Sequence, residues 1–262
     1  MSRYDFRSPR LYVDHALKPG AEVTLDTSQA HYLRNVLRLK AGDAVLAFNG
    51  RDGEWRTTLA GKGKRFALAL EEQTRPQTAP ADLHYLFAPL KHERLDYMVQ
   101  KAVEMGVSRL QPVLTKHTQV KRVNVGRLRA NAIEAAQQCG VLSLPDVAEP
   151  TTFGRAMAAR KADRLLVFCD EDAEVADPVT ALSDARLAPS AMLPLTMSNA
   201  GGPQPIALLI GPEGGFAEDE RAALLKLPNI VRLSLGPRIL RADTAAVAAL
   251  ALVQALLGDW RT

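Results

Sequence analysis

The chain has 262 residues and a mass of 28.5 kDa, which is enough for one large domain or two smaller ones, each with its own core. Hydrophobic residues make up 47% of the chain and charged residues 24%, and these globular proportions exclude a disordered protein. The 33 Lys and Arg residues outnumber the 29 Asp and Glu residues, for a net charge of +4. This charge suits an anionic partner, but it also suits ordinary solubility.

The sequence lacks signals for export, membrane insertion and metal binding. The first residues, MSRYDFRSPRLYV, are charged and contain no continuous apolar region, so no signal peptide is expected. The longest apolar segment, 245–257, is shorter than the about 20 residues that a membrane span requires. Cys139 and Cys169 have no CxxC spacing and no nearby histidine pair, so neither a disulfide framework nor a metal site is expected. We predict a soluble, cytoplasmic protein without a bound metal.

Five short segments near the N-terminus have the composition of β-strands: RLYV, EVTL, DAVLAFNG, EWRTTLAG and RFALAL. Turn residues separate them at Pro19-Gly20, Gly42-Asp43, Asn49-Gly50 and Gly61. Short strands at regular spacing predict a small barrel or sandwich. Basic residues are concentrated in 1–66, which suits a polyanion such as RNA. We assign this module to 1–73 and a linker, TRPQTAP, to 74–80.

One helical segment, SQAHYLRNVLRL, interrupts these strands. Its spacing predicts one face with Leu33, Val36 and Leu37 and another with Arg34 and Arg38, which are four residues apart. The arginine face is either a solvated surface or a two-pronged phosphate contact.

Beyond Pro80, apolar strands alternate with helices. The strand segments are DLHYLFAPL, LQPVLT, RLLVFCDE, IALLIG and IVRLSLG, and the helical segments are KHERLDYMVQKAVEMG, VGRLRANAIEAAQQCG, EDERAALLKL and DTAAVAALALVQALLG. This alternation predicts a mostly parallel sheet with helices on both faces, in a second domain at 81–262. Four prolines and adjacent glycines predict a long loop at 184–205. The last helix is apolar nearly all round, so it is either buried or part of an interface.

A glycine-rich turn follows the strand that ends at Ile210, in the segment LLIGPEGGFAEDE. A Walker A loop would need a lysine and a hydroxyl, and a Rossmann fingerprint would need G-x-G-x-x-G early in a βαβ unit. This turn has neither, and it carries Glu213, Glu218 and Asp219 where a phosphate would sit. An acidic turn repels anions and suits a cation, which argues against ATP and NAD.

A second turn with the same plan, LSLGPRILRADTAA, follows 25 residues beyond Gly211. If the two strands are adjacent in one parallel sheet, both turns lie side by side at its carboxyl end, where such folds bind ligands. Two independent strand-to-helix turns are the alternative. Together, the two turns favour a slot for a flat adenine and a positively charged group.

These two turns resemble the paired signature of the SPOUT methyltransferases and, within that class, the bacterial 16S rRNA (uracil-N3)-methyltransferase family. HYLRNVLRLKAGD, KHERLDYMVQKAVEMGV and EAAQQCG are similar to blocks of that family in the same order, so the resemblance covers most of the chain. It implies an α/β fold with a knotted, SPOUT-type parallel sheet in the C-terminal domain and helices on both faces. It also implies that the N-terminal module is a small PUA-like β-barrel that positions RNA.

The resemblance further implies an activity. Members of the family transfer a methyl group from S-adenosylmethionine to N3 of one uridine, U1498, in the 16S rRNA of the 30S ribosomal subunit. It implies a homodimer through the C-terminal domain, with which the apolar last helix is compatible. The alternatives are an inactive RNA-binding ribosome-assembly factor and a SPOUT methyltransferase that acts on another RNA. A nucleotide-dependent oxidoreductase is disfavoured by the missing fingerprint.

The chain departs from the family's pattern in three places. Val141 follows the Q-C-G triplet where arginine is common, the loop at 184–205 is longer than usual, and Ala242-Asp243 replaces a Thr-Glu or Glu-Thr pairing. The first departure affects the triplet's contact with RNA. The third leaves Thr244 as the residue to carry over from this stretch.

The resemblance assigns cofactor binding to backbone groups and apolar side chains of both turns: Leu209, Ile210, Gly211, Gly214, Gly215, Leu235, Gly236, Ile239, Leu240 and Thr244. These residue types suit adenine, which peptide groups recognise in an apolar slot. For Leu209 and Leu235, core packing is the alternative. Because S-adenosylmethionine carries its methyl group on a sulfonium, the protein needs neither a metal nor a covalent nucleophile.

Three residues are candidates for catalysis, which requires loss of the uracil N3–H proton. Arg241 is the candidate for stabilising negative charge on the flanking carbonyl oxygens, unless it forms a salt bridge with Asp243 or Glu213. Glu213 or Asp243 is the candidate proton acceptor, and Glu213 is alternatively a stabiliser of the sulfonium.

RNA contacts are predicted in both domains. The target base must leave its stack, and phosphate contacts orient the RNA without specifying its sequence. The candidates are Arg10, Arg34 and Arg38 in the N-terminal module and Lys91 and Arg94 in the second domain, with a solvated surface charge as the alternative for each.

Overall fold

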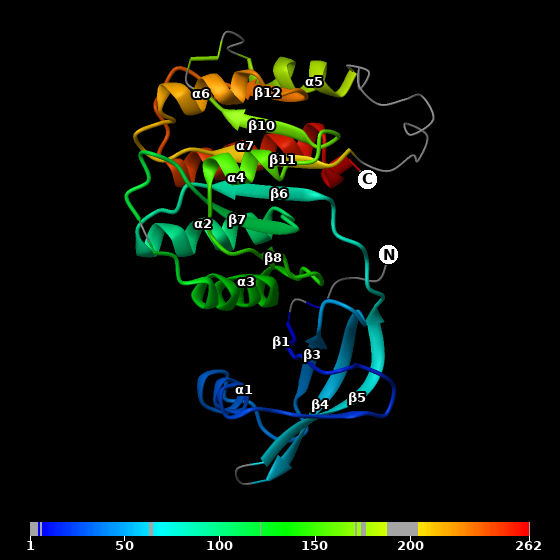
Figure 1. Ribbon diagram of the computed structural model, residues 1–262. Coiled ribbons are helices and arrows are strands. Elements are labelled where there is room, and N and C mark those ends of the chain that lie inside the picture. Colours follow the sequence, from blue (N-terminus) through cyan, green and yellow to red (C-terminus); the bar gives the residue numbers. More distant parts are fainter. Residues whose placement is uncertain are drawn as a thin grey trace. The chain divides into compact units, whose positions relative to one another are not determined.

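The computed structural model describes residues 5, 7–62, 65–120, 122–170, 172–173, 177–187 and 204–261, and Figure 1 shows its elements. The chain divides into two compact units: unit 1 is Met1–Ala79 with Ile133–Leu144, and unit 2 is Pro80–Ala132 with Pro145–Thr262. The sequence did not indicate that 133–144 belongs to unit 1. The domain limits of 1–73, 74–80 and 81–262 stay a prediction, and the last strand of unit 1 continues to Arg75, inside the predicted linker.

Unit 1 contains one curled sheet of five strands (Figure 1). The strands are β1 (Arg10–Tyr12), β2 (Glu22–Thr24), β3 (Ala44–Phe48), β4 (Glu54–Lys62) and β5 (Arg65–Arg75), in the order β1-β3-β4-β5-β2. β1 pairs with β3 in parallel, and the other pairs are antiparallel. Side chains that include Leu33, Trp55 and Phe66 form its core. The predicted strands are therefore confirmed.

The helical segment of unit 1 differs from its prediction. α1 (Thr27–His31) begins with a capping box between Asp26 and Gln29 and continues as the π-helical turn η1 (Tyr32–Val36). The wider π turn changes the spacing of its faces, so that Leu33 is buried while Val36 is 58% exposed. Arg38 lies beyond the helix with a φ of +59°, so Arg34 and Arg38 do not share a helical face.

Unit 2 contains a parallel sheet whose strands run in the order β12-β10-β11-β6-β7-β8, with β9 paired to β7. The strands are β6 (Leu83–Phe87), β7 (Arg109–Leu114), β8 (Asp146–Val147), β9 (Thr151–Thr152), β10 (Leu165–Cys169), β11 (Ile206–Ile210) and β12 (Ile230–Leu233). Every described pair is parallel, as predicted. The strands before the two glycine turns, β11 and β12, are not adjacent, because β10 lies between them.

Helices cover both faces of this sheet (Figure 1). They are α2 (His92–Glu104), α3 (Val125–Cys139), α4 (Phe153–Ala158), α5 (Pro178–Leu187), α6 (Glu218–Leu225) and α7 (Ala242–Leu256), followed by the 3₁₀ turn η2 (Asp259–Arg261). Phe153 of α4 and Leu224 of α6 pack with one set of strand side chains, while α7 packs against β11, α2 and α5. The predicted loop at 184–205 is wrong at 184–187, which belong to α5, and 188–203 lie outside the described residues.

Two further observations concern membranes and metals. Among the described residues, no helix has the length and apolar character to cross a membrane. Within the same part of the chain, no group of three or more His, Cys, Asp and Glu residues is placed to hold a metal ion.

Candidate functional site

A cavity of about 200 Å³ opens in unit 2 at the carboxyl ends of β10, β11 and β12. Its walls come from the end of β10, from both glycine turns and from the starts of α6 and α7. The lining residues are Cys169, Asp170, Asp172, Ile210, Gly211, Pro212, Glu213, Gly215, Phe216, Arg221, Leu233, Ser234, Leu235, Gly236, Arg238, Ile239, Leu240, Ala242 and Ala245. The two turns therefore line one cavity, although β10 separates their strands.

Each turn favours glycine for a different reason. A Cβ at Gly211 would lie 3.1 Å from the Phe216 ring, which packs at the same time near Phe153 and Phe168. Gly236 has a φ of +95°, a conformation that strains other residues. A side chain at Gly211 would displace the ring, and one at Gly236 would strain the backbone.

A segment after β7 fastens the first turn. His117 Nδ1 lies 3.1 Å from the carbonyl oxygen of Gly214 and 3.2 Å from that of Gly215. Because carbonyl oxygens only accept hydrogen bonds, Nδ1 must carry the proton. The Lys116 N–H donates to Glu220 Oε1 at 2.9 Å, and the Ala217 N–H donates to Glu220 Oε2 at 3.1 Å. The sequence analysis did not predict these contacts. The signal that could have pointed to these residues is their position after an apolar strand.

Seven of the ten predicted cofactor-binding residues line the cavity: Ile210, Gly211, Gly215, Leu235, Gly236, Ile239 and Leu240. The other three do not. Leu209 is fully buried in the core, because neighbouring strand residues point to opposite faces of the sheet. Gly214 faces His117, and Thr244 is exposed in the first turn of α7. For Leu209, the core-packing alternative is correct.

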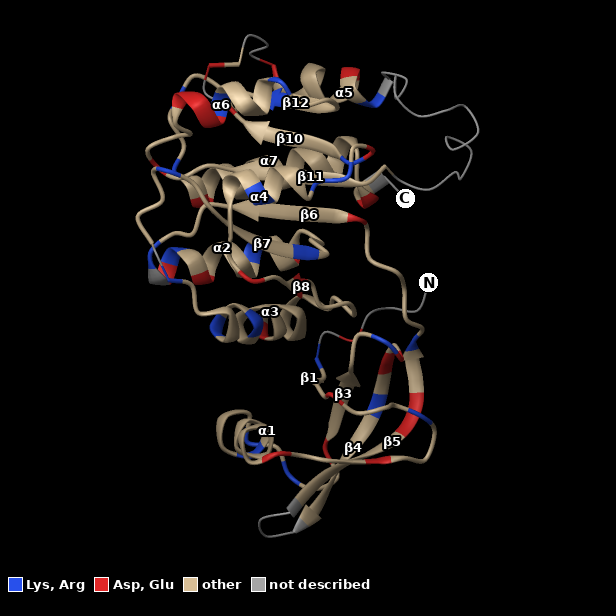
Figure 2. Cartoon of the chain, in the orientation of Figure 1, with Lys and Arg blue, Asp and Glu red and all other residues tan. Residues whose placement is uncertain are grey.

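The predicted catalytic acids flank Arg94. Glu213 lines the cavity, and its Oε1 is 3.4 Å from Arg94 Nη1. Asp243 Oδ2 is 3.8 Å from Arg94 Nε. Arg94, predicted to contact RNA, thus lies between two carboxylates. Figure 2 shows that the first turn of α6, just beyond Glu213, is also acidic.

Arg241 is the N-cap residue of α7 and is exposed, outside the lining of the cavity. Glu213 and Asp243, its alternative salt-bridge partners, are both paired with Arg94. The structure thus places Arg241 beside the cavity, at the start of the helix that its second turn leads into.

The end of β10 contributes residues that the sequence analysis did not single out. Asp170 is 6% exposed and is paired with Arg221 and Arg232. Burial raises the pKa of the neighbouring Cys169 thiol to about 12, so this cysteine stays protonated and unreactive. The signal that could have found these residues is their place at the carboxyl end of an apolar strand. The order of the strands, which brings them to the cavity, could not be predicted from the sequence.

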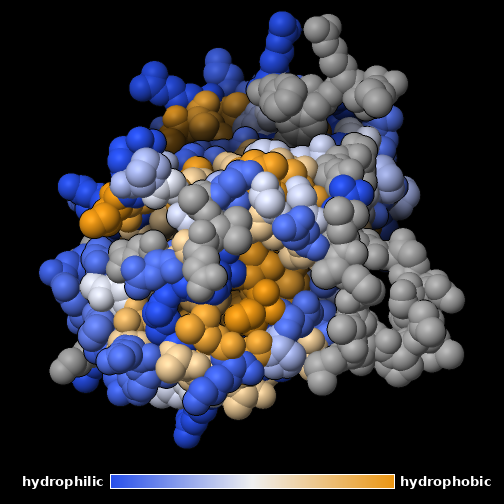
Figure 3. Space-filling view, turned by 90° about the horizontal axis from the view of Figure 1, so that it is seen from above, coloured by the Kyte–Doolittle hydropathy of each residue, from blue (hydrophilic) through white to orange (hydrophobic). Residues whose placement is uncertain are grey.

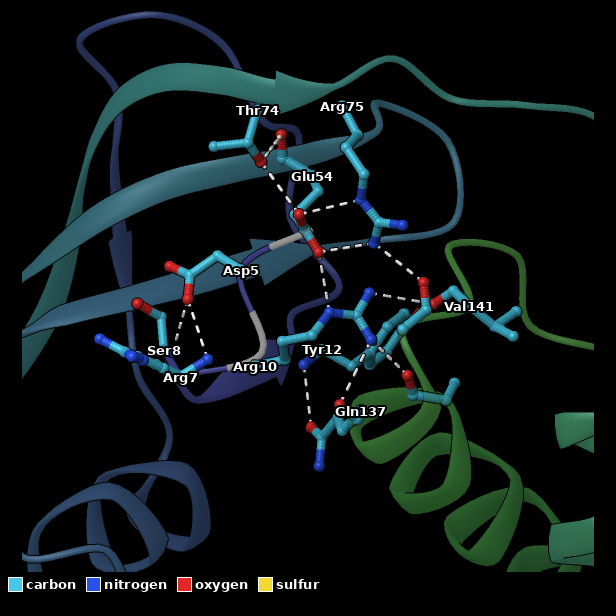
Figure 4. Close-up of polar contacts among 12 residues, drawn as sticks. Asp5, Arg7, Ser8, Arg10, Tyr12, Glu54, Thr74, Arg75, Gln137 and Val141 are labelled. Atoms are coloured by element: carbon cyan, nitrogen blue, oxygen red, sulfur yellow. Dashed lines mark hydrogen bonds and ion pairs between the residues drawn. The ribbon is translucent and has the colours of Figure 1, made fainter. Parts of the chain in front are cut away.

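Arg10 does not act as a surface cation, and the prediction that it contacts RNA is corrected. Its Nε lies 2.8 Å from Glu54 Oε2, and Nη2 donates to the Val141 carbonyl at 3.1 Å (Figure 4). A further bond from Nη1 reaches the Ala136 carbonyl, so the guanidinium caps the C-terminal end of α3. The side chain is 4% exposed.

The other predicted RNA-binding residues of unit 1 and Lys91 are exposed. Arg34 lies over the Phe66 ring at 4.5 Å from its centroid, and its exposure leaves it accessible to a ligand. Arg38 and Lys91 are also exposed. Their role in binding RNA stays a prediction.

Comparison with known proteins identifies the relationship. A family model described as an RNA methyltransferase domain matches residues 77–254, and one described as an RNA methyltransferase PUA domain matches residues 25–72. A protein of Synechocystis named ribosomal RNA small subunit methyltransferase E is 34% identical over 90% of this chain and 74% of its own length. The protein of that name from Rickettsia conorii is 30% identical over 95% of this chain and 96% of its own. The chain belongs to the ribosomal RNA small subunit methyltransferase E family.

A solved structure supports the family assignment. A putative methyltransferase from Legionella pneumophila, in complex with the bound cofactor S-adenosylmethionine, is 26% identical and has a TM-score of 0.78. The match covers 97% of this chain and 99% of that one. The predicted family and α/β SPOUT fold class, with its N-terminal PUA domain, are confirmed. The knot itself stays a prediction, because strand order does not record how one segment passes through another.

Proposed function

We propose that this chain transfers a methyl group from S-adenosylmethionine to N3 of a uridine in the 16S rRNA of the small ribosomal subunit. The observation that carries the proposal is the cavity lined by both glycine turns, in a chain that belongs to a family of small-subunit rRNA methyltransferases. The Legionella structure with bound S-adenosylmethionine supports the choice of cofactor. The target uridine that we propose is the family's U1498.

The lining of the cavity suits the chemistry of this cofactor. Ile210, Leu235 and Leu240 offer an apolar slot for adenine, and the glycines expose the backbone groups that recognise its edge. Glu213 places a carboxylate at the wall, which favours a positively charged sulfonium. S-adenosylmethionine supplies an activated methyl group. The chain therefore has to bind the cofactor, orient the uracil and accept the N3–H proton.

Arg241 and the two acids are the proposed catalytic groups. Arg241 stabilises the negative charge that develops on the uracil carbonyl oxygens as the N3–H proton leaves. Glu213 or Asp243 accepts that proton. Arg94 lies within ion-pair distance of both carboxylates and thereby positions them next to each other.

RNA recognition is divided between two kinds of contact. Arg34 and Arg38 of the PUA domain and Lys91 of unit 2 bind phosphates, which orient the RNA without reading its sequence. The uridine leaves its stack to reach the cavity, and this is easiest in an unpaired segment of RNA. We place the reaction in the cytoplasm, where small subunits are found.

We also propose a homodimer through the C-terminal domain. α7 is apolar nearly all round, and Val247, Ala251 and Leu252 on it are only partly buried. Ile239 in the second turn is 91% exposed, and the face of the molecule in Figure 3 carries a central apolar patch. A second copy of the chain would cover such surface.

Leu252→Glu tests the dimer. We expect the wild-type chain to have twice the monomer mass by light scattering and the variant to have the monomer mass, because a charge in an apolar interface opposes association. Asp259→Lys, an exposed change close to the same end, is the control. A monomeric wild-type chain would overturn the dimer without affecting the proposed reaction.

The proposed reaction is tested by methyl transfer from labelled S-adenosylmethionine to small subunits that lack the modification, followed by nucleoside analysis. Label in 3-methyluridine is the expected result. Cofactor binding without transfer would point to another RNA or to an assembly factor. A chain that binds no S-adenosylmethionine would overturn the proposal.

A further inference from the structure

Asp170 occupies a central place at the edge of the sheet where the cavity opens. It follows β10 directly, and β10 pairs with β11 on one side and with β12 on the other. The Asp170 N–H donates to the Leu233 carbonyl at 3.1 Å, which ties its backbone to the last residue of β12. Asp170 is therefore fixed between the strands that lead into the two glycine turns.

Its carboxylate binds one arginine from each side. Arg221 Nε lies 3.1 Å from Oδ1, and Arg232 Nε lies 2.8 Å from Oδ2. Arg221 belongs to α6, the helix that follows the first turn, and Arg232 belongs to β12, the strand that precedes the second. One carboxylate thus links α6 with β12, and both elements contribute residues to the wall of the cavity.

The ionised carboxylate of Asp170 offsets one of the two positive charges of this cluster. Burial alone would raise the pKa of Asp170, but hydrogen bonds from Arg221 and Arg232 hold it below its usual value. A neutral side chain at this position would remove the carboxylate that both partly buried guanidinium groups share, although Arg221 keeps Asp172 at 3.8 Å. Their repulsion would move α6 and β12 apart.

We propose that Asp170 is a positioning residue for the cofactor site, which holds the two glycine turns at the separation that S-adenosylmethionine requires. The inference rests on the proposed function, because it assumes that the cavity binds this cofactor. Asp170 lines the cavity, but both of its carboxylate oxygens accept hydrogen bonds from arginines, so we assign it a role through Arg221 and Arg232 and not as a ligand of the cofactor. The affinities for the cofactor and for its demethylated product should therefore depend equally on Asp170.

Calorimetric titration of the full-length chain with S-adenosylmethionine and with S-adenosylhomocysteine tests this role. We expect Asp170→Asn to raise the Kd of both compounds about tenfold, because a charged hydrogen-bonded link between the turns is lost. The number of sites per folded chain should stay unchanged, and kcat at saturating cofactor should stay within about twofold of wild type. Asp170→Glu, which keeps the charge, should recover part of the affinity.

Two further variants complete the design. Asp146→Asn is the matched control, because the exposed Asp146 at the start of β8 pairs with Arg109 at 2.9 Å, and this variant should bind like wild type. If Asp170→Asn does not fold, Arg221→Lys and Arg232→Lys take its place in the test. Each keeps the positive charge but loses the guanidinium that binds the Asp170 carboxylate from one side. Each should raise the Kd of both compounds several-fold, by a smaller factor than the loss of both links.

Three results would overturn the inference. A folded Asp170→Asn chain with wild-type Kd values would show that the link is not needed, and fewer sites at an unchanged Kd would show a purely structural role. A weaker affinity for S-adenosylmethionine alone would show that the carboxylate acts directly on the sulfonium. A wild-type chain that binds neither compound would instead overturn the proposed function, and the inference with it.

Discussion

Arg238 and Arg241 lie three residues apart in the second turn, but only Arg238 lines the cavity. Arg241→Ala should lower kcat on the order of a hundredfold, because the variant lacks the charge that we propose stabilises the reacting uracil. Its Kd for S-adenosylmethionine should stay within about twofold of wild type. Steady-state kinetics with small subunits and calorimetric titration measure the two quantities.

Arg238→Ala is the comparison for Arg241→Ala. Because Arg238 lines the cavity, its removal should raise the Kd for the cofactor several-fold and change kcat less. If Arg241→Ala retains wild-type turnover, its catalytic role is wrong, and Arg94, which is paired with Glu213 and Asp243, becomes the next candidate.

Single residues of the turns could be predicted because local sequence decides them. Gly211 and Gly236 are needed by the turns themselves, and Ile210 points into the cavity by strand alternation. The same alternation should have excluded Leu209, which occupies the opposite face. Arg10 could not be placed from sequence, because its partner Glu54 lies 44 residues away and its other contacts are carbonyl groups of α3.

At the scale of elements, the pattern predicted five of the seven described strands of the parallel sheet, missing the two-residue strands β8 and β9, but it did not predict their order. An apolar run has the same appearance at any position in a sheet that is buried on both faces. β10 therefore could not be placed between β11 and β12, and Asp170, Arg221 and Arg232 remained unconnected. The helix α5 was missed because its apolar residues have little helical periodicity next to a proline-rich segment.

In unit 1, Glu54 holds together β1, β4, β5 and the end of α3. Its carboxylate contacts Arg10 at 2.8 Å and Arg75 at 2.7 Å, and both arginines donate to carbonyl groups around Gly140 and Val141 (Figure 4). Glu54→Gln should lower the free energy of unfolding by about 3–5 kcal/mol, because it leaves two buried or half-buried cations without their anion. Urea unfolding measures this change.

The same carboxylate predicts a dependence of stability on pH. Burial raises the pKa of Glu54, but hydrogen bonds from Arg75 and Arg10 outweigh it and leave the pKa below its ordinary value. A depressed pKa in the folded state stabilises the fold above the unfolded pKa of about 4.3, and this contribution is lost as the pH falls through the folded pKa. Wild type should therefore lose stability on acidification more steeply than Glu54→Gln.

Glu72→Gln is the control for both measurements, because the exposed Glu72 is 3.5 Å from Arg56 and such pairs contribute about 1 kcal/mol or less. Equal unfolding free energies for Glu54→Gln and Glu72→Gln would show that the buried cluster contributes no more than a surface pair.

At the scale of the whole molecule, the basic charge and the PUA domain together predict an electrostatic component in RNA binding. Each phosphate that a cation neutralises releases counterions, so the affinity falls as the salt concentration rises. On single-stranded RNA, each such contact contributes about 0.7 to the slope of the logarithm of affinity against the logarithm of salt concentration. Arg38→Gln should therefore weaken RNA binding to a similar degree for all sequences, and its slope should be shallower than that of wild type by about 0.7. Filter binding between low and moderate salt measures both.

Two arginines of the same unit make this prediction specific. Arg51 is exposed but paired with Asp14 at 3.2 Å, so Arg51→Gln should leave the salt slope unchanged if RNA binds on the side of Arg34 and Arg38. Arg10→Gln should lower the free energy of unfolding, because the Arg10 guanidinium is buried against Glu54. The molecules that stay folded should bind RNA with the wild-type salt slope. A shallower slope for Arg10→Gln and a wild-type slope for Arg38→Gln would reverse the correction that the structure makes to the sequence prediction. RNA binding would then require the end of α3 to release Arg10 before any phosphate could reach it.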